Sequence, residues 1–256
     1  MSALLVGATR VTERNATVYW RLWYMFVSGF FEPLFFLLSI GIGVGELVGG
    51  VQVGGRTVEY ESFVAPGMMA TAAMNGAVFD ATFSVFFKLK FMKTYDSMVA
   101  TPLTTTQIVT GELLWSTFRC GAYSVAFLGI AALLGYVESW WSLLAVPVAL
   151  LIGAAFASLG VCLTSFLRGW RDFDFINIAL IPLFLFSATF YPLSVYPRTL
   201  ELLVQVSPLY HGVALTRALF FGDLGWGLLV HVVVLAGITV IAGRAAARRF
   251  ERLLVH

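Results

Sequence analysis

The chain has 256 residues, of which 59% are hydrophobic and only 12% are charged. Because soluble domains carry roughly 25% charged residues, this composition excludes an ordinary soluble fold and indicates a membrane protein. The formal net charge of +2 is too small to suggest a nucleic-acid partner.

The first predicted element is a helix over residues 6–24. Apolar residues recur there at helical spacing, at Val11, Val18 and Leu22, while arginines occupy other faces. Tyrosines and tryptophans near its end suit the headgroup region of a bilayer. We therefore expect an interfacial helix, with a plain cytoplasmic extension of the first span as the alternative.

Six apolar runs follow, each long enough to cross a membrane, which takes about 20 residues in a helix. Their length excludes barrel strands, which alternate over about ten residues. The expected spans are residues 26–48, 63–87, 106–134, 141–167, 173–191 and 226–247. The sequence thus predicts an all-α polytopic membrane protein with six transmembrane helices.

Lysine and arginine are distributed unevenly between the connecting segments. Twelve lie before the first span or after the second, fourth and sixth, and three lie in the opposite loops, at Arg56, Arg198 and Arg217. Because cytoplasmic loops carry the excess of basic residues, both termini are predicted to be cytoplasmic.

A charged insert, FKLKFMKTYDSMVATPLTTTQ, joins the second and third spans. Lys88, Lys90 and Lys93 are expected to mark the cytoplasmic membrane edge. Thr94 can cap a helix, and Asp96 in the first turn suits the helix dipole. We expect a two-turn helix over residues 94–101 with one side available to a partner. Its small apolar face comprises Tyr95, Met98 and Val99.

The outer segment over residues 192–223 is too polar for a span and too apolar for a free loop. Pro192, Pro197 and Pro208 interrupt helices along it. We expect a pair of short re-entrant helices, shielded by protein or a water-filled cavity, with an ordinary surface cap as the alternative.

Four ionisable residues lie inside the predicted spans: Glu32, Asp80, Glu112 and Arg119. A charge at the centre of a span costs about 2.5–3.5 kcal/mol, so such residues usually face the bundle interior and find partners. We expect Arg119 to pair with Asp80, with Glu112 as the second choice, in a structural salt bridge rather than a substrate site.

Several stretches together resemble the ABC-2 type permeases, the membrane half of ATP-driven exporters. They are Glu32-Pro33, FVAPGMMATAAMNGAVFD in the second span, TYDSMVATPL in the insert and PLSVYP…SPLYH in the outer segment. Within that family, the chain looks most like the permeases of nodulation lipo-oligosaccharide exporters, with daunorubicin-resistance permeases as wider kin. It has FYP where many relatives have a glycine and FP.

The resemblance implies one transmembrane domain over residues 1–256 in the cytoplasmic (inner) membrane. Two permease copies, expected to be identical, would pair above two separate ABC ATPase subunits, which bind ATP and Mg. Residues 94–101 would be the coupling helix, with Thr94, Tyr95, Asp96, Met98 and Val99 as coupling residues. An outer gate would involve Phe190, Tyr191, Pro192, Pro197 and Pro208. The expected cargo is an amphipathic lipid, a glycolipid or lipo-oligosaccharide, or a hydrophobic drug.

Signals for catalysis are missing from the sequence. It has no GxxxxGK[ST] phosphate loop, and its histidines and cysteines lack ligand spacing, so we expect no catalytic residue, metal or cofactor on this chain. Two other classes stay open, a polytopic enzyme acting on lipids and an ATP-independent carrier or channel. Co-purification with an ATPase and loss of transport on ATP depletion would separate the exporter from both.

Overall fold

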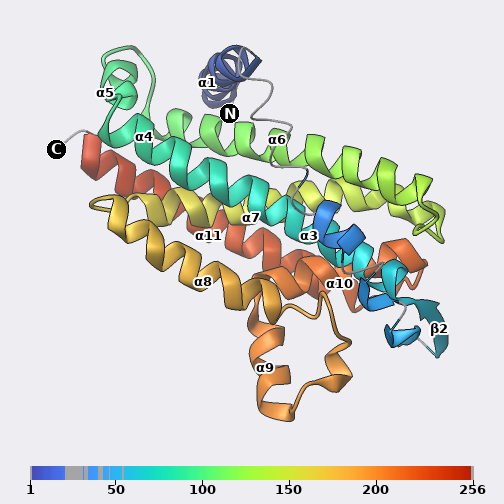
Figure 1. Cartoon of the computed structure of the whole chain (residues 1–256). Helices are drawn as coiled ribbons and strands as arrows, with labels where there is room; N and C mark the ends of the chain where they lie inside the picture. Colours follow the sequence, from blue (N-terminus) through green and yellow to red (C-terminus); the bar gives the residue numbers. More distant parts are fainter. Residues whose placement is uncertain are drawn as a thin grey trace.

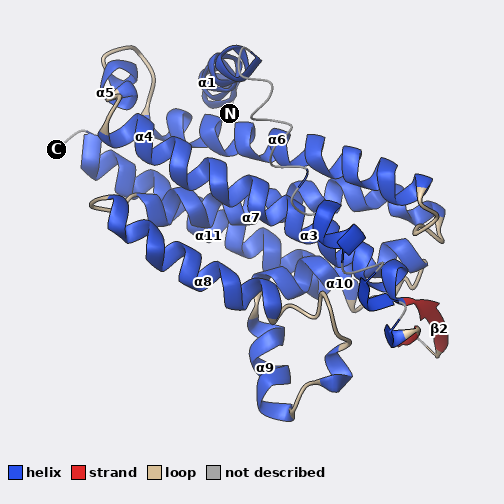
Figure 2. Ribbon diagram, viewed as in Figure 1, coloured by secondary structure: helices blue, strands red, loops and turns tan. Residues whose placement is uncertain are grey.

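The computed structural model describes residues 2–20, 31, 34–39, 43–45, 47–53 and 55–254. The long helices lie side by side in one slanted bundle, with short helices at its ends (Figures 1 and 2). The first expected span, residues 26–48, falls partly outside the described residues. Glu32 and Pro33 are among the residues outside them.

Most of the described residues are helical. In chain order the helices are α1 (Ser2–Trp20), α3 (Tyr60–Phe79), the π-helix η1 (Asp80–Ser84), α4 (Val85–Lys90), α5 (Thr94–Val99), α6 (Thr105–Leu133), the 3-10 helix η2 (Trp140–Leu144), α7 (Ala145–Thr164), the 3-10 helix η3 (Trp170–Asp172), α8 (Phe173–Leu185), the 3-10 helix η4 (Leu193–Val195), α9 (Arg198–Val206), α10 (Pro208–Phe221) and α11 (Leu228–Leu254). Among them, α6, η2 with α7, and α11 are long and apolar enough to cross a membrane. The predicted class, an all-α membrane protein, agrees with these helices.

A β-hairpin was not predicted from the sequence. β1 (Gly50–Val53) pairs antiparallel with β2 (Arg56–Glu59), and Val51 lies opposite Val58 with both side chains buried. The turn includes Gly55, whose φ of 82° suits glycine. The alternation on either side of two glycines is a hairpin signal that the search for long apolar runs passes over.

The central rod of the bundle is formed by α3, η1 and α4, which continue one another from Tyr60 to Lys90. α3 is buried on almost every side. The wide turn of η1 leaves backbone carbonyls without their usual helical donors, and the Thr164 hydroxyl on α7 donates to the Ala81 carbonyl at 3.1 Å. A Cβ at Gly160 would lie 2.8 Å from the Cβ of Ala81, so the glycine lets α7 approach the rod.

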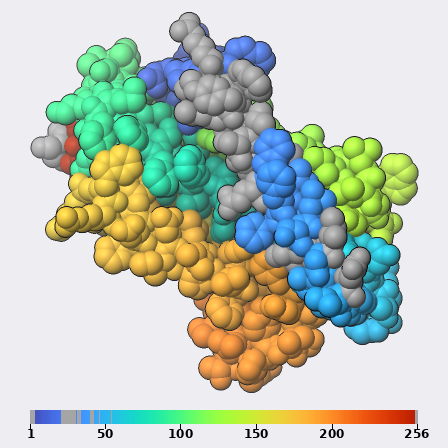
Figure 3. Space-filling model, viewed as in Figure 1, coloured from blue at the N-terminus to red at the C-terminus, as the bar shows by residue number. Residues whose placement is uncertain are grey.

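The two ends of the bundle carry different elements (Figure 1). α5, the C-terminal end of α11 and the α7–α8 turn lie at one end. The β-hairpin and the α6–α7 turn lie at the other. Figure 3 shows the segment around α9 (orange) as a lobe that projects from the bundle.

The three prolines of the outer segment mark helix starts. Pro192 immediately precedes η4, Pro197 immediately precedes α9, and Pro208 is the first residue of α10. This agrees with the predicted interruption of helices, because the fixed φ of proline suits the first turn and its missing N–H costs nothing there. α10 packs among α3, α7 and α11, so the second of the two helices is part of the bundle.

The fifth expected span, residues 173–191, ends earlier than predicted. α8 stops at Leu185, and the chain beyond it is irregular, with Ala188 at a φ of 58°. Arg217 on α10 holds this irregular segment, because its guanidinium donates to the carbonyls of Ala188 at 2.8 Å and Thr189 at 3.2 Å. Arg217 therefore fixes the irregular segment to α10 rather than lying free in a loop.

Candidate functional site

A buried ion pair joins the central rod to α6. Arg119 Nη1 donates to Asp80 Oδ1 at 3.1 Å, and the two side chains are 5% and 1% exposed. The hydroxyl of Ser116 donates to Asp80 Oδ2 at 2.8 Å, and the hydroxyl of Tyr19 on α1 donates to Asp80 Oδ1 at 2.7 Å. The pair predicted from the sequence is present, and its carboxylate has the additional donors that a buried charge requires.

A second buried pair lies nearer to α5. Lys88 Nζ donates to Glu112 Oε2 at 2.8 Å and to Asn15 Oδ1 at 3.0 Å. The Asn15 amide in turn donates to Glu112 at 3.0 Å. Lys88 is buried and its charge is neutralised inside the protein, which the sequence did not predict. Its place at the cytoplasmic membrane edge stays a prediction. Glu112, the second choice for Arg119, pairs with Lys88 instead.

Helix α1 takes part in both pairs. Asn15 and Tyr19 are four residues apart, so they share one helix face, and each binds a different pair. The same helix packs across the start of α6, where the Thr12 hydroxyl donates to the Gly111 carbonyl at 3.2 Å. A displacement of α1 would therefore strain both ion pairs at once.

The apolar face of α5 is covered by the chain itself. Tyr95 is fully buried, and its ring lies 5.7 Å from that of Phe250 on α11, centroid to centroid. Met98 is also buried. The expectation that this face is available to a partner was wrong, because the ends of α11 and α6 cover it. The exposed side of α5 consists of Asp96 and Ser97.

The start of α5 also differs from the prediction. Lys93, with a φ of 48°, precedes the helix as its cap residue, and Thr94 is the first helical residue rather than the cap. The helix ends at Val99, two residues before the expected end. Burial, together with the nearby charge of Glu112, raises the pKa of the Tyr95 phenol well above its usual value, so the phenol stays neutral. Tyr95 thus places α5 beside the Lys88–Glu112 pair.

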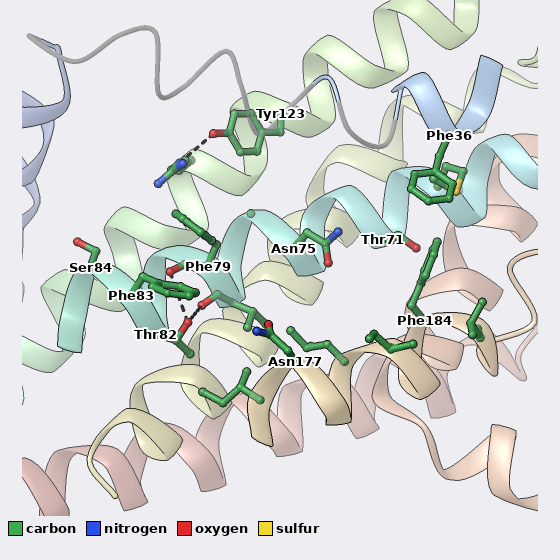
Figure 4. Close-up of a pocket in the computed structure, with 18 of the residues that line it drawn as sticks. Phe36, Thr71, Asn75, Phe79, Thr82, Phe83, Ser84, Tyr123, Asn177 and Phe184 are labelled. Atoms are coloured by element: carbon green, nitrogen blue, oxygen red, sulfur yellow. Dashed lines mark hydrogen bonds between the residues drawn. The ribbon is translucent and has the colours of Figure 1, made fainter. Parts of the chain in front are cut away.

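A large cavity lies along the rod, between α3 and α8 (Figure 4). Its volume is about 1630 Å³, and its wall is mostly apolar. It extends from Lys88 and Met92, near α5, to Tyr60 and Tyr196, near the hairpin and α9. A cavity of this length and polarity can hold a molecule with a long apolar part.

A few polar side chains interrupt the apolar wall. Thr71 and Asn75 come from α3 and Asn177 from α8, and Figure 4 shows the two amides directed into the space between these helices. Arg119 and Tyr123 line the same cavity. The sequence reasoning missed the asparagines, although an amide within the runs AAMNGAV and FINIAL is itself unusual at membrane depth.

The residues predicted for the outer gate divide into two groups. Phe190 and Tyr191 line the cavity, Phe190 buried beside Phe184 and Tyr191 57% exposed. The Tyr60 hydroxyl donates to the Phe190 carbonyl at 3.3 Å and so fixes the segment. The three prolines set the path of the chain behind these aromatic residues rather than lining the cavity.

Comparison with known proteins gives one consistent result. The family described as "ABC-2 type transporter" matches residues 8–221. A protein named Nodulation protein J from Rhizobium leguminosarum bv. trifolii is 34% identical over 82% of this chain and 79% of its own length. Proteins of the same name are 34% identical in Sinorhizobium fredii, over 80% and 77%, and 27% identical in Azorhizobium caulinodans, over 83% and 83%. The family match includes most of α1, both ion pairs, α5 and α10.

Proposed function

Because the chain belongs to the ABC-2 type transporter family, we propose that it is the permease subunit of an ATP-driven exporter of amphipathic glycolipids or lipo-oligosaccharides. The chain is a membrane permease of this class rather than an enzyme. ATP and Mg bind to a separate ABC ATPase, two copies of which act on two copies of the permease.

The observation that carries this proposal is the position of α5. The helix lies at one end of the bundle, with Tyr95 and Met98 anchored inside and Asp96 and Ser97 exposed. A short, firmly seated helix with a polar outer side suits a rigid contact to another protein. Asp96 and Ser97 therefore contact the ATPase, whereas Tyr95, Met98 and Val99 transmit the contact inward.

The path inward runs through the buried charges. Tyr95 interacts electrostatically with Glu112, and Glu112 accepts hydrogen bonds from Lys88 and Asn15. Lys88 lies on α4, Glu112 on α6 and Asn15 on α1, so a movement of α5 would be transmitted to these three helices. A permease of this kind is a two-state element whose equilibrium its partner biases.

The cavity supports an amphiphile as the cargo. Aromatic and aliphatic side chains supply most of its wall, and hydroxyls, amides and the basic side chains of Arg14, Lys88 and Arg119 supply a smaller polar part. This mixed wall, together with the resemblance of the sequence to the permeases of nodulation lipo-oligosaccharide exporters, favours a lipid that carries sugar over a purely apolar drug. Ile176, Asn177, Leu180 and Ile181 of α8 line the cavity, and a second copy of the chain against this helix would complete its wall.

We place six spans in the cytoplasmic membrane, with both termini and α5 on the cytoplasmic side. α6, η2 with α7, and α11 supply three of them. The rod of α3, η1 and α4, α8 with the irregular segment after it, and residues 26–48 supply the others. α9 and α10 form the re-entrant outer pair, and α1 lies along the inner interface.

The test is reconstitution with a candidate ABC ATPase partner from the same organism. The tagged permease should retain the ATPase through purification, and liposomes with both proteins should move a fluorescent glycolipid between leaflets only with ATP. An ATPase without its catalytic glutamate is the matched control. Movement that continues with this control would support a passive carrier, and chemical change of the glycolipid would support an enzyme.

A further inference from the structure

Two amide side chains face the cavity from different helices. Asn75 lies on α3, one turn beyond Thr71, and Asn177 lies on α8 (Figure 4). The Thr71 hydroxyl already donates to the Gly67 carbonyl at 2.9 Å, so its oxygen faces the cavity as an acceptor. Within a mostly apolar wall, these three groups form one polar patch.

Neither amide makes a hydrogen bond within the part of the chain that the structure describes. An amide that is taken out of water without a partner is costly, so buried amides normally have partners. Asn75 is only half-buried because the cavity reaches it, and Asn177 is exposed on the cavity side. The donors and acceptors of both side chains are therefore open to whatever occupies the cavity.

The charges around the cavity narrow the class of ligand. Arg14, Lys88 and Arg119 lie on the wall. Asp80 and Glu112 already neutralise Arg119 and Lys88 at 3.1 Å and 2.8 Å, and Arg14 lies on α1 next to Asn15, at the end of the cavity near the Lys88–Glu112 pair. Beside the amides the wall offers uncharged donors and acceptors only. An anionic headgroup would find no free countercharge there, whereas hydroxyl or amide groups of a sugar can both donate to and accept from asparagine.

From this arrangement we propose that Asn75 and Asn177 recognise the uncharged sugar headgroup of the transported amphiphile, while the aromatic wall holds its acyl chain. The proposal rests on the exporter function proposed above and adds the residues that set its preference. Because the two amides come from α3 and α8, they can bind one headgroup together only at a particular distance between these helices. Recognition therefore depends on the conformation of the bundle.

The experiment compares two probes that share one acyl chain. NBD-glucosylceramide carries the sugar and NBD-ceramide lacks it. Liposomes that contain the permease and its ATPase are loaded with either probe, and ATP-dependent movement between leaflets is read by dithionite quenching. The measured quantity is the ratio of the glucosylceramide rate to the ceramide rate, for the wild type, Asn75→Leu, Asn177→Leu and Ser124→Ala.

The wild type should prefer glucosylceramide, and each leucine variant should lower the ratio about fivefold to tenfold, as expected when an uncharged hydrogen bond is lost. Ser124→Ala, a buried hydroxyl on α6 outside the cavity, should leave the ratio unchanged. Movement of neither probe by the wild type would remove the proposed function itself. A wild type without sugar preference, leucine variants with an unchanged ratio, or an equal loss for both probes would overturn the role of the amides while the exporter stands.

Discussion

The Lys88 ammonium lies 2.8 Å from the Glu112 carboxylate, with the two side chains 10% and 2% exposed. Asn15 of α1 bonds to both partners. The two buried charges stabilise each other, and their hydrogen bonds to Asn15 also attach α1 to the bundle. Loss of either partner leaves the other buried and uncompensated.

Lys88→Met and Glu112→Leu should therefore each lower the free energy of unfolding by about 3–5 kcal/mol. The double variant should recover most of that loss, because it leaves no buried charge. Thermal inactivation of the purified permease measures the effect. Arg10→Ala is the control, since the Arg10–Glu13 pair is 74% and 66% exposed and contributes at most about 1 kcal/mol. Additive losses in the double variant would contradict the pairing.

The pair at Asp80 should behave as a unit as well. Asp80→Arg and Arg119→Asp should each abolish ATP-dependent transport, and the exchanged pair should restore part of it. The recovery will be incomplete, because the hydroxyls of Ser116 and Tyr19 are placed to donate to a carboxylate at position 80 and would have to reorient to accept from a guanidinium there. Transport that stays normal in either single variant would show that the pair has no role.

Two substitutions on α5 should separate contact from support. Asp96→Lys changes an exposed side chain, so it should leave thermal stability unchanged and weaken retention of the ATPase. Tyr95→Ala empties a fully buried site and should cost about 3–5 kcal/mol of stability. Glu13→Lys, an exposed acid on α1, is the matched control for the charge change. Full ATPase retention in Asp96→Lys would remove this face from the interface.

The proposed topology predicts opposite labelling at two exposed positions. Cysteines at Lys90 and Glu59, in a chain with Cys120 and Cys162 replaced by alanine, should react with an impermeant maleimide from opposite sides of the membrane. Lys90 should label only in inverted vesicles and Glu59 only in intact cells. Reaction of both cysteines in intact cells would be incompatible with six spans.

The sequence predicts well those features that depend on long apolar runs. The third expected span, 106–134, matches α6 to within a residue at each end, because Thr104 and Gln107 form a local capping box where the run begins. The prolines of the outer segment likewise act locally. The Asp80–Arg119 pair was predictable because few charges lie inside the spans and each needs a partner.

Other features depend on which surfaces meet, and the sequence does not contain that information in a local form. A lysine count along the chain does not distinguish an exposed Lys90 from a buried Lys88, since only the fold brings Glu112 to the latter. The apolar side of α5 could be identified in the sequence, but the residue that buries it, Phe250 on α11, comes from the far end of the chain. The cavity amides were overlooked because two asparagines have no motif until α3 and α8 lie side by side.

The π-helix η1 has a consequence for the two ion pairs together. In an ordinary α-helix each residue turns about 100°, so Asp80 and Lys88, eight residues apart, would point about 80° away from each other. A single π turn absorbs one extra residue, and the two positions then behave as if seven residues apart, within about 20°. Glu112 and Arg119 on α6 are also seven apart. The π turn thus lets Asp80 and Lys88 face α6 on the same side of the rod. Deletion of one residue within η1 would turn one of these two side chains away from its partner on α6 without changing any of the four charges.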